Sequence, residues 1–164
     1  AAPISCGQVQ TAPTVIATII KALEVEAGDA VLEIGTGSGY QSAILSRLCF
    51  RLYTIDRFHT LIDEAVIRFQ SLKLTNVITR IGDGEAGWPD DNQFDRIVMN
   101  AGGSELSFAL LNQLKIGGTL IAPLLKDKGL SELTLYRRKA NGFDRIMLGR
   151  ARFIPLIPGI AQRL

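Results

Sequence analysis

Three glycines at alternate positions follow a short apolar run, a pattern suited to holding a ligand. Gly35, Gly37 and Gly39 come directly after residues 31–34. Glycines allow tight turns and close approach of a ligand, and amides that lead into a helix can donate to polar or anionic groups. A dinucleotide fingerprint, G-x-G-x-x-G, would place its third glycine where this chain has Tyr40, so the spacing disfavours NAD.

Acidic residues accompany this loop at the ends of successive apolar runs. Asp56 comes 21 residues after Gly35, close to the offset at which a carboxylate contacts a ribose diol. Asp83 lies between two glycines after the next run, and Glu33 precedes the loop. Because ligands of open α/β sheets bind outside the carboxyl ends of the strands, these three acids are expected to border one crevice. Taken singly, Asp56 could instead cap a helix and Asp83 could belong to a plain turn.

Other side chains that could do chemistry are few. The single histidine, His59, excludes a site built from several histidines, and no metal site is predicted. We expect His59 at the start of a surface helix. Cys6 and Cys49 are too few for a disulfide framework, and they are interpreted as thiols of a cytoplasmic protein.

Strand-like and helix-like segments alternate along the chain, which predicts an α/β fold, a Rossmann-like, doubly wound, mostly parallel sheet. After Pro123 the alternation stops, and Asn141-Gly142 predicts an antiparallel β-hairpin at the end. The whole is interpreted as five βα units followed by this hairpin. The expected strands are 30–34, 52–55, 77–81, 95–99, 119–122, 132–138 and 145–153, and the expected helices are 12–23 with Thr11 as N-cap, 40–48, 60–72 and 105–114.

Length and composition indicate one globular domain, residues 1–164. The chain is 47% hydrophobic and 21% charged, which excludes a disordered, collagen-like or coiled-coil protein. No apolar stretch approaches the length of a membrane span, and no signal peptide is evident at the N-terminus. Because the first residue is Ala, we expect the chain to lack an N-terminal segment of a longer gene product.

Charge is distributed unevenly, although the net charge is only +2. Residues 1–125 carry 9 Lys and Arg against 13 Asp and Glu, a net −4, whereas residues 126–164 carry 9 against 3, a net +6. A basic end of this kind could attract an anionic substrate or nucleic acid. The basic residues lack interleaved aromatic residues, which disfavours nucleic acid.

The motifs taken together resemble the protein-L-isoaspartate O-methyltransferase family of the class I S-adenosylmethionine-dependent methyltransferases. The glycine loop with its strand-end acid is common to the whole class, whereas the Gly-Gln opening combined with Gly-Asp-Gly and Gly-Trp-Pro is much more specific. The resemblance covers nearly the whole chain, in the right order. It is carried by residues 7–13 (GQVQTAP), 32–41 (LEIGTGSGYQ), 82–84 (GDG), 87–89 (GWP), 94–97 (FDRI), 113–118 (QLKIGG) and 152–156 (RFIPL).

This resemblance implies a role for each matching residue. S-adenosylmethionine would be the cofactor and S-adenosylhomocysteine its product, and Thr11 would stand at the position of an active-site serine. The substrate would be an isoaspartyl peptide or protein, bound along Asn100, Ala101 and the last stretch, which contains Arg152, Phe153, Ile154, Pro155 and Leu156. The cofactor's methionine part would contact Glu33, Gly35, Thr36, Gly37, Ser38 and Gly39, its ribose Asp56 beside Arg57, and its adenine Asp83 and Gly84.

The chain departs from the family pattern at three places. Thr11 adds a methyl group to the expected serine, Thr14 replaces a common histidine, and residues 100–103 (NAGG) replace a Val-Thr-Ala-Ala-type loop. These departures bear on the substrate and on activity more than on the cofactor.

The chemistry implied is methyl transfer to a carboxylate, which is already ionised at pH 7 and needs alignment more than a strong base. The leading hypothesis is therefore repair of isoaspartyl residues in damaged proteins. Three alternatives remain. The first is a methyltransferase acting on a small carboxylate or on RNA, the second is a methyltransferase-like binding module with weak or no catalysis, and the third is an unrelated nucleotide-binding α/β domain.

Overall fold

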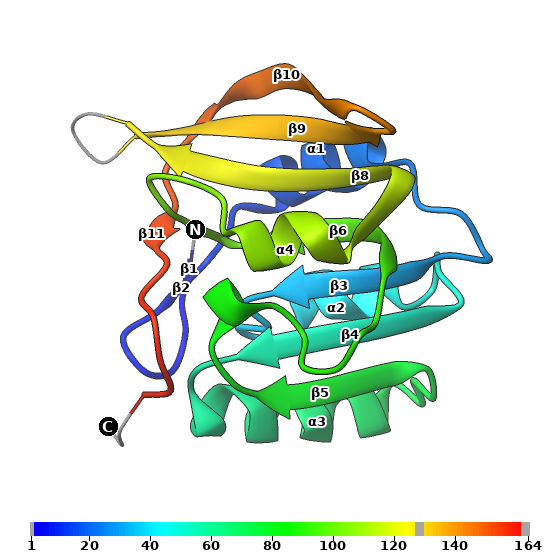
Figure 1. Ribbon diagram of the computed structural model, residues 1–164. Helices are drawn as coiled ribbons and strands as arrows, with labels where there is room; N and C mark the ends of the chain where they lie inside the picture. Colours follow the sequence, from blue (N-terminus) through cyan, green and yellow to red (C-terminus); the bar gives the residue numbers. More distant parts are fainter. Residues whose placement is uncertain (1, 127–129, 162–164) are drawn as a thin grey trace.

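The computed structural model describes residues 2–126 and 130–161, which form a twisted sheet with helices on both faces (Figure 1). The helices are α1 (Pro13–Leu23), α2 (Tyr40–Leu45), α3 (His59–Ser71), α4 (Phe108–Gln113) and the short 3-10 helix η1 (Gly84–Ala86). The strands are β1 (Ala2–Pro3), β2 (Val9–Gln10), β3 (Ala30–Ile34), β4 (Arg51–Asp56), β5 (Val77–Ile81), β6 (Phe94–Met99), β7 (Ala101–Gly102), β8 (Leu114–Leu125), β9 (Ser131–Lys139), β10 (Gly142–Ala151) and β11 (Ile154–Pro155).

The main sheet has the strand order β10-β9-β8-β6-β3-β4-β5. β5, β4, β3, β6 and β8 are parallel, whereas β9 and β10 run antiparallel at one end. This arrangement confirms the predicted mostly parallel sheet that ends in an antiparallel hairpin. Two further short pairs, β1 with β2 and β7 with β11, lie outside the main sheet.

The sheet is covered on both faces because its central strands carry apolar side chains in both directions. Leu32 of β3 packs in the cluster that contains Leu110 of α4. Val31, the preceding residue, packs with Ile19 of α1 and Leu45 of α2. Right-handed crossovers place α2 and α3 on the same face, and Figure 1 shows α1 on that face and α4 on the other.

The element boundaries correct several expectations. α1 begins at Pro13, and Ala12 is its cap residue without a side-chain hydrogen bond, so the prediction of Thr11 as N-cap was wrong. Extended backbone at Ala12, which a following proline favours, moves the helix start past Thr11. β8 begins at Leu114 instead of residue 119, because Leu114 is buried and pairs with Phe94.

The prediction of five βα units was also wrong in one connection, the one between β5 and β6. Among the described residues, β5 is followed only by the 3-10 turn η1 before the chain reaches β6. The Asp83 side chain accepts a hydrogen bond from the Glu85 amide at 2.9 Å and caps this turn. The connection of β9 to β10 agrees with the predicted hairpin, with Ala140 and Asn141 forming the turn.

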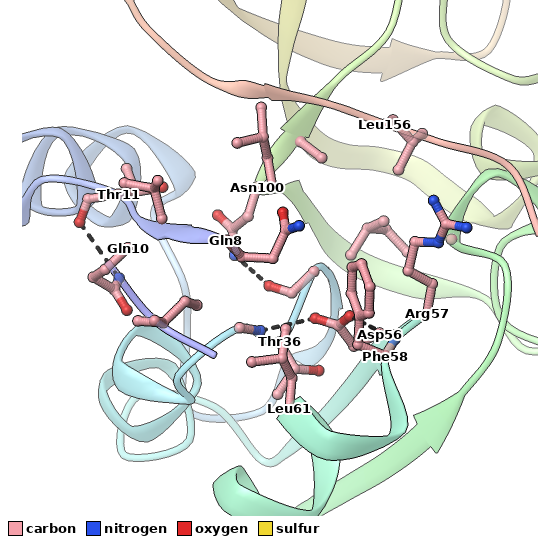
Figure 2. A pocket seen from close by; sticks show the side chains of 18 of the residues that line it. Gln8, Gln10, Thr11, Thr36, Asp56, Arg57, Phe58, Leu61, Asn100 and Leu156 are labelled. Carbon is pink, nitrogen blue, oxygen red and sulfur yellow. Dashed lines mark hydrogen bonds between the residues drawn. The ribbon is translucent and has the colours of Figure 1, made fainter. Parts of the chain in front are cut away.

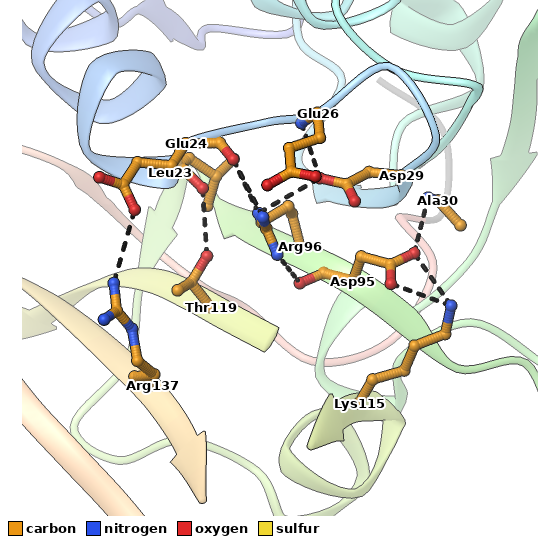
Figure 3. A network of polar contacts seen from close by, with 10 residues as sticks. All are labelled: Leu23, Glu24, Glu26, Asp29, Ala30, Asp95, Arg96, Lys115, Thr119 and Arg137. Atoms are coloured by element: carbon orange, nitrogen blue, oxygen red, sulfur yellow. Dashed lines mark hydrogen bonds and ion pairs between the residues drawn. The ribbon is translucent and has the colours of Figure 1, made fainter. Parts of the chain in front are cut away.

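A polar network joins the loop after α1 to the sheet, at the edge opposite the glycine loop (Figure 3). The Arg96 side chain of β6 donates to the Glu24 carbonyl and forms an ion pair with Asp29 at 3.3 Å. Both charged side chains are nearly buried, 13% and 11% exposed. Lys115 contacts Asp95, which also accepts from the Ala30 amide that begins β3. This network anchors the start of β3, and the glycine loop follows the other end of the same strand.

Other features confirm or limit the sequence interpretation. His59 begins α3 on the surface, as expected, with its ring 2.8 Å from Asp63. Cys6 and Cys49 are free thiols, and burial raises the pKa of Cys49 to about 11. No helix among residues 2–126 and 130–161 is both long enough and apolar enough to traverse a bilayer.

Candidate active site

A pocket opens at the carboxyl ends of the central strands, where the strand order reverses between β3 and β6. It is lined by residues 35–37 after β3, residues 56–58 at the end of β4, Gly84 after β5, and residues 100–101 after β6. Ligands of open α/β sheets bind at such a switch point. Figure 2 shows Gln10 and Thr11 at one side of the pocket and Arg57 and Leu156 at the other.

Gly35 and Gly37 form the part of the glycine loop that lines this pocket. A Cβ atom on Gly35 would lie 3.2 Å from the Asn100 side chain, so the loop passes close to the end of β6. Gly37 has a φ of +53° and donates its amide to the Asp56 carboxylate at 2.9 Å. The loop therefore brings bare backbone to the pocket, as predicted, and Thr36 lies between the two glycines in the lining.

Gly39 and Ser38 face elsewhere and are not among the pocket-lining residues. Gly39 has a φ of +78°, and a Cβ atom there would be 2.8 Å from the ring of Phe69 on α3. The Ser38 hydroxyl donates to Gln10. The third glycine thus lets α2 and α3 approach each other, and Ser38 contacts the N-terminal segment. The expected cofactor contacts of both residues remain predictions.

Asp56 presents a nearly buried carboxylate to the pocket. One oxygen accepts the Gly37 amide at 2.9 Å and the other accepts the Phe58 amide at 3.1 Å. Burial raises the pKa of Asp56, and these backbone donors oppose that shift. A carboxylate that lines the pocket is an acceptor, which fits the hydroxyl groups of a ribose.

Glu33 is completely buried beneath the glycine loop and does not line the pocket. Its carboxylate accepts from Ser42 of α2, from Thr54 of β4 at 2.8 Å, and from Asn100 at 3.2 Å. Burial raises the pKa of Glu33 to about 7, and these hydrogen bonds lower it. These bonds link β3, β4, α2 and the end of β6, and the expected contact of Glu33 with a cofactor stays a prediction.

Asp83 and Gly84, which were both expected beside the adenine, differ in whether they line the pocket. Gly84 lines the pocket, but Asp83 does not, because its carboxylate accepts the amides of Glu85 and of Gly159. The Gly159 contact, at 2.7 Å, fastens the C-terminal segment beside the pocket. Asp83 thus links the turn after β5 to the C-terminal segment, and its expected contact with the adenine remains a prediction.

A second cavity adjoins the first and contains most of the predicted substrate residues. Arg152 and Phe153 line it, and the two cavities share Thr11, Asn100 and Ile154 in their linings. Ala101 lines only the first cavity, and it pairs with Ile154 where β7 meets β11. The structure therefore gathers these side chains from three distant parts of the chain.

The first pocket has the chemistry that an adenosyl ligand requires. Ile55, Phe58, Leu61 and Leu156 give it apolar walls around the Asp56 carboxylate. Arg57, expected beside a ribose, lines the pocket with its guanidinium 5.4 Å from the ring centre of Phe58. Apolar surface for a base and an acceptor for a diol are both present, so the residues fit S-adenosylmethionine.

The sequence reasoning missed several residues that line this pocket. Gln8, Gln10, Gln41 and Phe58 belong to the lining but were not among the predicted site residues. All but Phe58 lie inside the motifs quoted for the family resemblance, and that membership was the available signal. Phe58 has no comparable signal beyond its position two residues after Asp56.

Known proteins resemble the chain over nearly its whole length. The family model described as "Protein-L-isoaspartate(D-aspartate) O-methyltransferase (PCMT)" matches residues 1–160. A protein-L-isoaspartate O-methyltransferase of Xanthobacter autotrophicus is 43% identical over 164 residues, 100% of this chain and 75% of the relative. One from Paracoccus denitrificans is 46% identical over 160 residues, covering 98% and 74%. The chain thus spans about three quarters of the length of these relatives.

Solved structures agree with these relatives. A protein-L-isoaspartate O-methyltransferase structure superimposes with a TM-score of 0.82 at 28% identity, covering 89% of this chain and 47% of that one. An S-adenosylmethionine-dependent methyltransferase from Thiobacillus denitrificans, solved with S-adenosyl-L-homocysteine, gives a TM-score of 0.60 at 25% identity, with coverages of 72% and 51%. These similarities confirm the fold class and the resemblance, and the chain belongs to the protein-L-isoaspartate(D-aspartate) O-methyltransferase family.

Proposed function

We propose that this protein transfers a methyl group from S-adenosylmethionine to the free carboxylate of isoaspartyl residues in peptides and proteins. The observation that carries the proposal is the pair of adjoining cavities. The first combines bare glycine backbone with the Asp56 carboxylate, and the second contains Arg152, while Thr11 and Asn100 line both. A donor in the first cavity and an acceptor in the second would meet beside Thr11.

The residues that would hold the cofactor lie along the strand ends. Gly35, Thr36 and Gly37 offer the loop, Asp56 with Arg57 beside it would hold the ribose, and Gly84 would lie against the adenine. When bound, S-adenosylmethionine supplies a methyl group on a sulfonium sulfur, and its transfer forms a carbon–oxygen bond as the carbon–sulfur bond breaks. The bonds from the Gly37 and Phe58 amides keep the Asp56 carboxylate oriented towards the pocket.

The acceptor side suits an anion. Arg152 is exposed at the second cavity, and among residues 2–126 and 130–161 it forms no ion pair. A free guanidinium can attract and orient a carboxylate, and the Thr11 hydroxyl can donate a hydrogen bond to one. A carboxylate is ionised at pH 7, so alignment of the acceptor takes the place of a general base, a role that surface His59 could not fill.

The alternative of RNA as acceptor finds less support. Much of the positive charge of the basic C-terminal region is paired with acids of the same molecule. Arg137 contacts Glu24, Lys139 contacts Asp144, and Arg150 contacts Glu132. Paired charges attract phosphates less than free ones, so the free Arg152 favours a small anionic group instead.

A paired-peptide assay tests this proposal. Purified protein is supplied with labelled S-adenosylmethionine and either an isoaspartyl peptide or the same peptide containing ordinary aspartate. We expect methylation of the first peptide only, and equal inactivity on both, with the cofactor bound, would contradict the assignment. Arg152→Met should raise KM for the isoaspartyl peptide without changing the affinity for S-adenosylhomocysteine, whereas Arg47→Met, a matched change on exposed surface, should alter neither.

The proposal also implies a partner and a compartment. The partners would be proteins that have accumulated isoaspartyl residues. Cys6 and Cys49 are both free thiols, as is usual in a reducing compartment, and we place the protein in the cytoplasm. Fractionation of the native organism with an antibody to the chain would test that placement.

A further inference from the structure

A residue that lines the first pocket carries a buried polar atom without a hydrogen-bond partner in the described part of the chain. Gln41, the second residue of α2, is 3% exposed and lines the pocket beside Gly35 and Asn100. Its Oε1 atom lacks a partner among residues 2–126 and 130–161. A buried acceptor without a donor costs free energy, so a donor supplied by a ligand would relieve that cost.

The neighbouring hydrogen bonds determine which end of the Gln41 amide is free. Asn100 donates its side-chain nitrogen to the Gly35 carbonyl at 2.9 Å and to Glu33 at 3.2 Å. A carbonyl oxygen only accepts, so the opposite orientation of Asn100 would place two acceptors together. The Asn100 Oδ1 atom therefore points to Gln41 and accepts its Nε2 at 3.0 Å. Gln41 Nε2 is thereby used, and Oε1 is left as the free atom.

The position of Gln41 along the strand ends indicates which part of a ligand it would meet. Asn100 follows β6, Gly35 follows β3, Asp56 ends β4 and Gly84 follows β5, and these strands are neighbours in that order. With the ribose at Asp56 and the adenine at Gly84, the methionine part of the cofactor extends towards β6. Gln41 contacts Asn100 at that end.

We propose that Gln41 Oε1 accepts a hydrogen bond from the α-ammonium group of the cofactor, and that Asn100 is a positioning residue, because its bond to Gln41 Nε2 determines which end of the amide is free. The inference rests on the proposed function. An amide oxygen repels carboxylates, which excludes both the cofactor's own carboxylate and the acceptor's as its partner. The ammonium is the donor that the methionine part offers, and hydrogen bonds to charged groups are stronger than neutral ones.

The test compares two ligands on Gln41→Met, which keeps the side-chain length but removes the amide. S-adenosylhomocysteine carries the ammonium, whereas 5′-methylthioadenosine lacks the whole amino-acid part. Calorimetric titration should show S-adenosylhomocysteine binding about 10- to 100-fold more weakly than to the unmodified protein. Binding of 5′-methylthioadenosine should stay within about twofold, which also shows that the variant is folded. Gln70→Met, on the exposed end of α3, should change neither affinity.

Asn100→Leu tests the positioning role. If Asn100 acts by orienting Gln41, the loss of S-adenosylhomocysteine affinity in the double variant should be smaller than the sum of the single losses, in units of free energy. Equal weakening of both ligands by Gln41→Met, or no weakening of either, would overturn the inference. A rise confined to KM for the isoaspartyl peptide would also overturn it, by assigning Gln41 to the acceptor. Failure of the unmodified protein to bind S-adenosylhomocysteine would instead overturn the proposed function.

Discussion

Replacement of Glu33 by glutamine should change how the stability of this protein depends on pH. Glu33 is fully buried, and burial raises its pKa from the ordinary value of 4.5 to about 7. The native state therefore holds this proton more tightly than the unfolded state does. The stability associated with the proton is fully present below about pH 4.5 and is lost as the pH rises through 7.

The size of the effect follows from these two pKa values. Their difference, from 4.5 to about 7, corresponds to about 3 kcal/mol of unfolding free energy, of which about 2 to 3 kcal/mol is lost between roughly pH 5 and 8. The glutamine of the variant would stay neutral across this range. Its amide nitrogen can donate to the Ser42 and Thr54 hydroxyls, which lie on one oxygen of Glu33, while its oxygen accepts from Asn100.

Urea unfolding of both proteins across this pH range measures the effect. The free energy of unfolding of Glu33→Gln, minus that of the unmodified protein, should increase by about 2 to 3 kcal/mol from roughly pH 5 to 8. Glu105→Gln, at an exposed position, should show no such trend. A difference that stays constant with pH for Glu33→Gln would refute the reasoning, since it would mean that Glu33 titrates normally in the folded protein.

Three further changes test other parts of the structure. Gly39→Ala should destabilise the protein by about 2 to 4 kcal/mol, because it combines a left-handed φ with a close contact, whereas Gly28→Ala, in open space, should be nearly neutral by thermal unfolding. Arg96→Met should cost about 3 kcal/mol in urea unfolding, since it leaves the Asp29 carboxylate nearly buried and unpaired. Asp56→Asn should weaken S-adenosylhomocysteine about tenfold or more in calorimetric titration, because one ribose-facing acceptor becomes a donor.

For each of these three predictions, one outcome would contradict the reasoning. Equal stability losses for Gly39→Ala and Gly28→Ala would show that neither the left-handed φ nor the close contact at Gly39 affects stability. Lys139→Met breaks an exposed pair with Asp144 and should cost less than about 1 kcal/mol, so a similar loss for Arg96→Met would argue against the buried network. Unchanged affinity of Asp56→Asn for S-adenosylhomocysteine would remove Asp56 from the cofactor site.

The main elements could be predicted from local patterns. The apolar run of β3, the glycines after it and the turn at Asn141-Gly142 each express a short-range preference of the backbone. Thr11 and Arg152 could be nominated because they lie inside recognisable motifs. Boundaries were less predictable where local preference was weak. Thus Leu114 enters the sheet because it is buried opposite Phe94, a contact that the run of residues around it does not reveal.

The sequence alone could not show that the three strand-end acids have different functions. Glu33, Asp56 and Asp83 all end or approach the ends of strands, and they looked equivalent on that basis. In the fold, Asp56 faces the pocket, Glu33 is bonded beneath the loop, and Asp83 anchors the Gly159 amide. Which donor reaches a carboxylate depends on segments that approach from far along the chain.

The amino-acid sequence by itself determined the family of this protein, because the family's motifs occur along the chain in the right order. It also determined the alternation of strands and helices and the position of the glycine loop, because turn chemistry and strand patterns are local properties of the chain. Only the tertiary structure decided which side chains line the pocket and which form hydrogen bonds to the segments around it. The orientation of Gln41 illustrates the reason: it depends on a hydrogen-bond chain through Asn100 to Gly35, and these partners meet only when β3, α2 and the end of β6 have packed together.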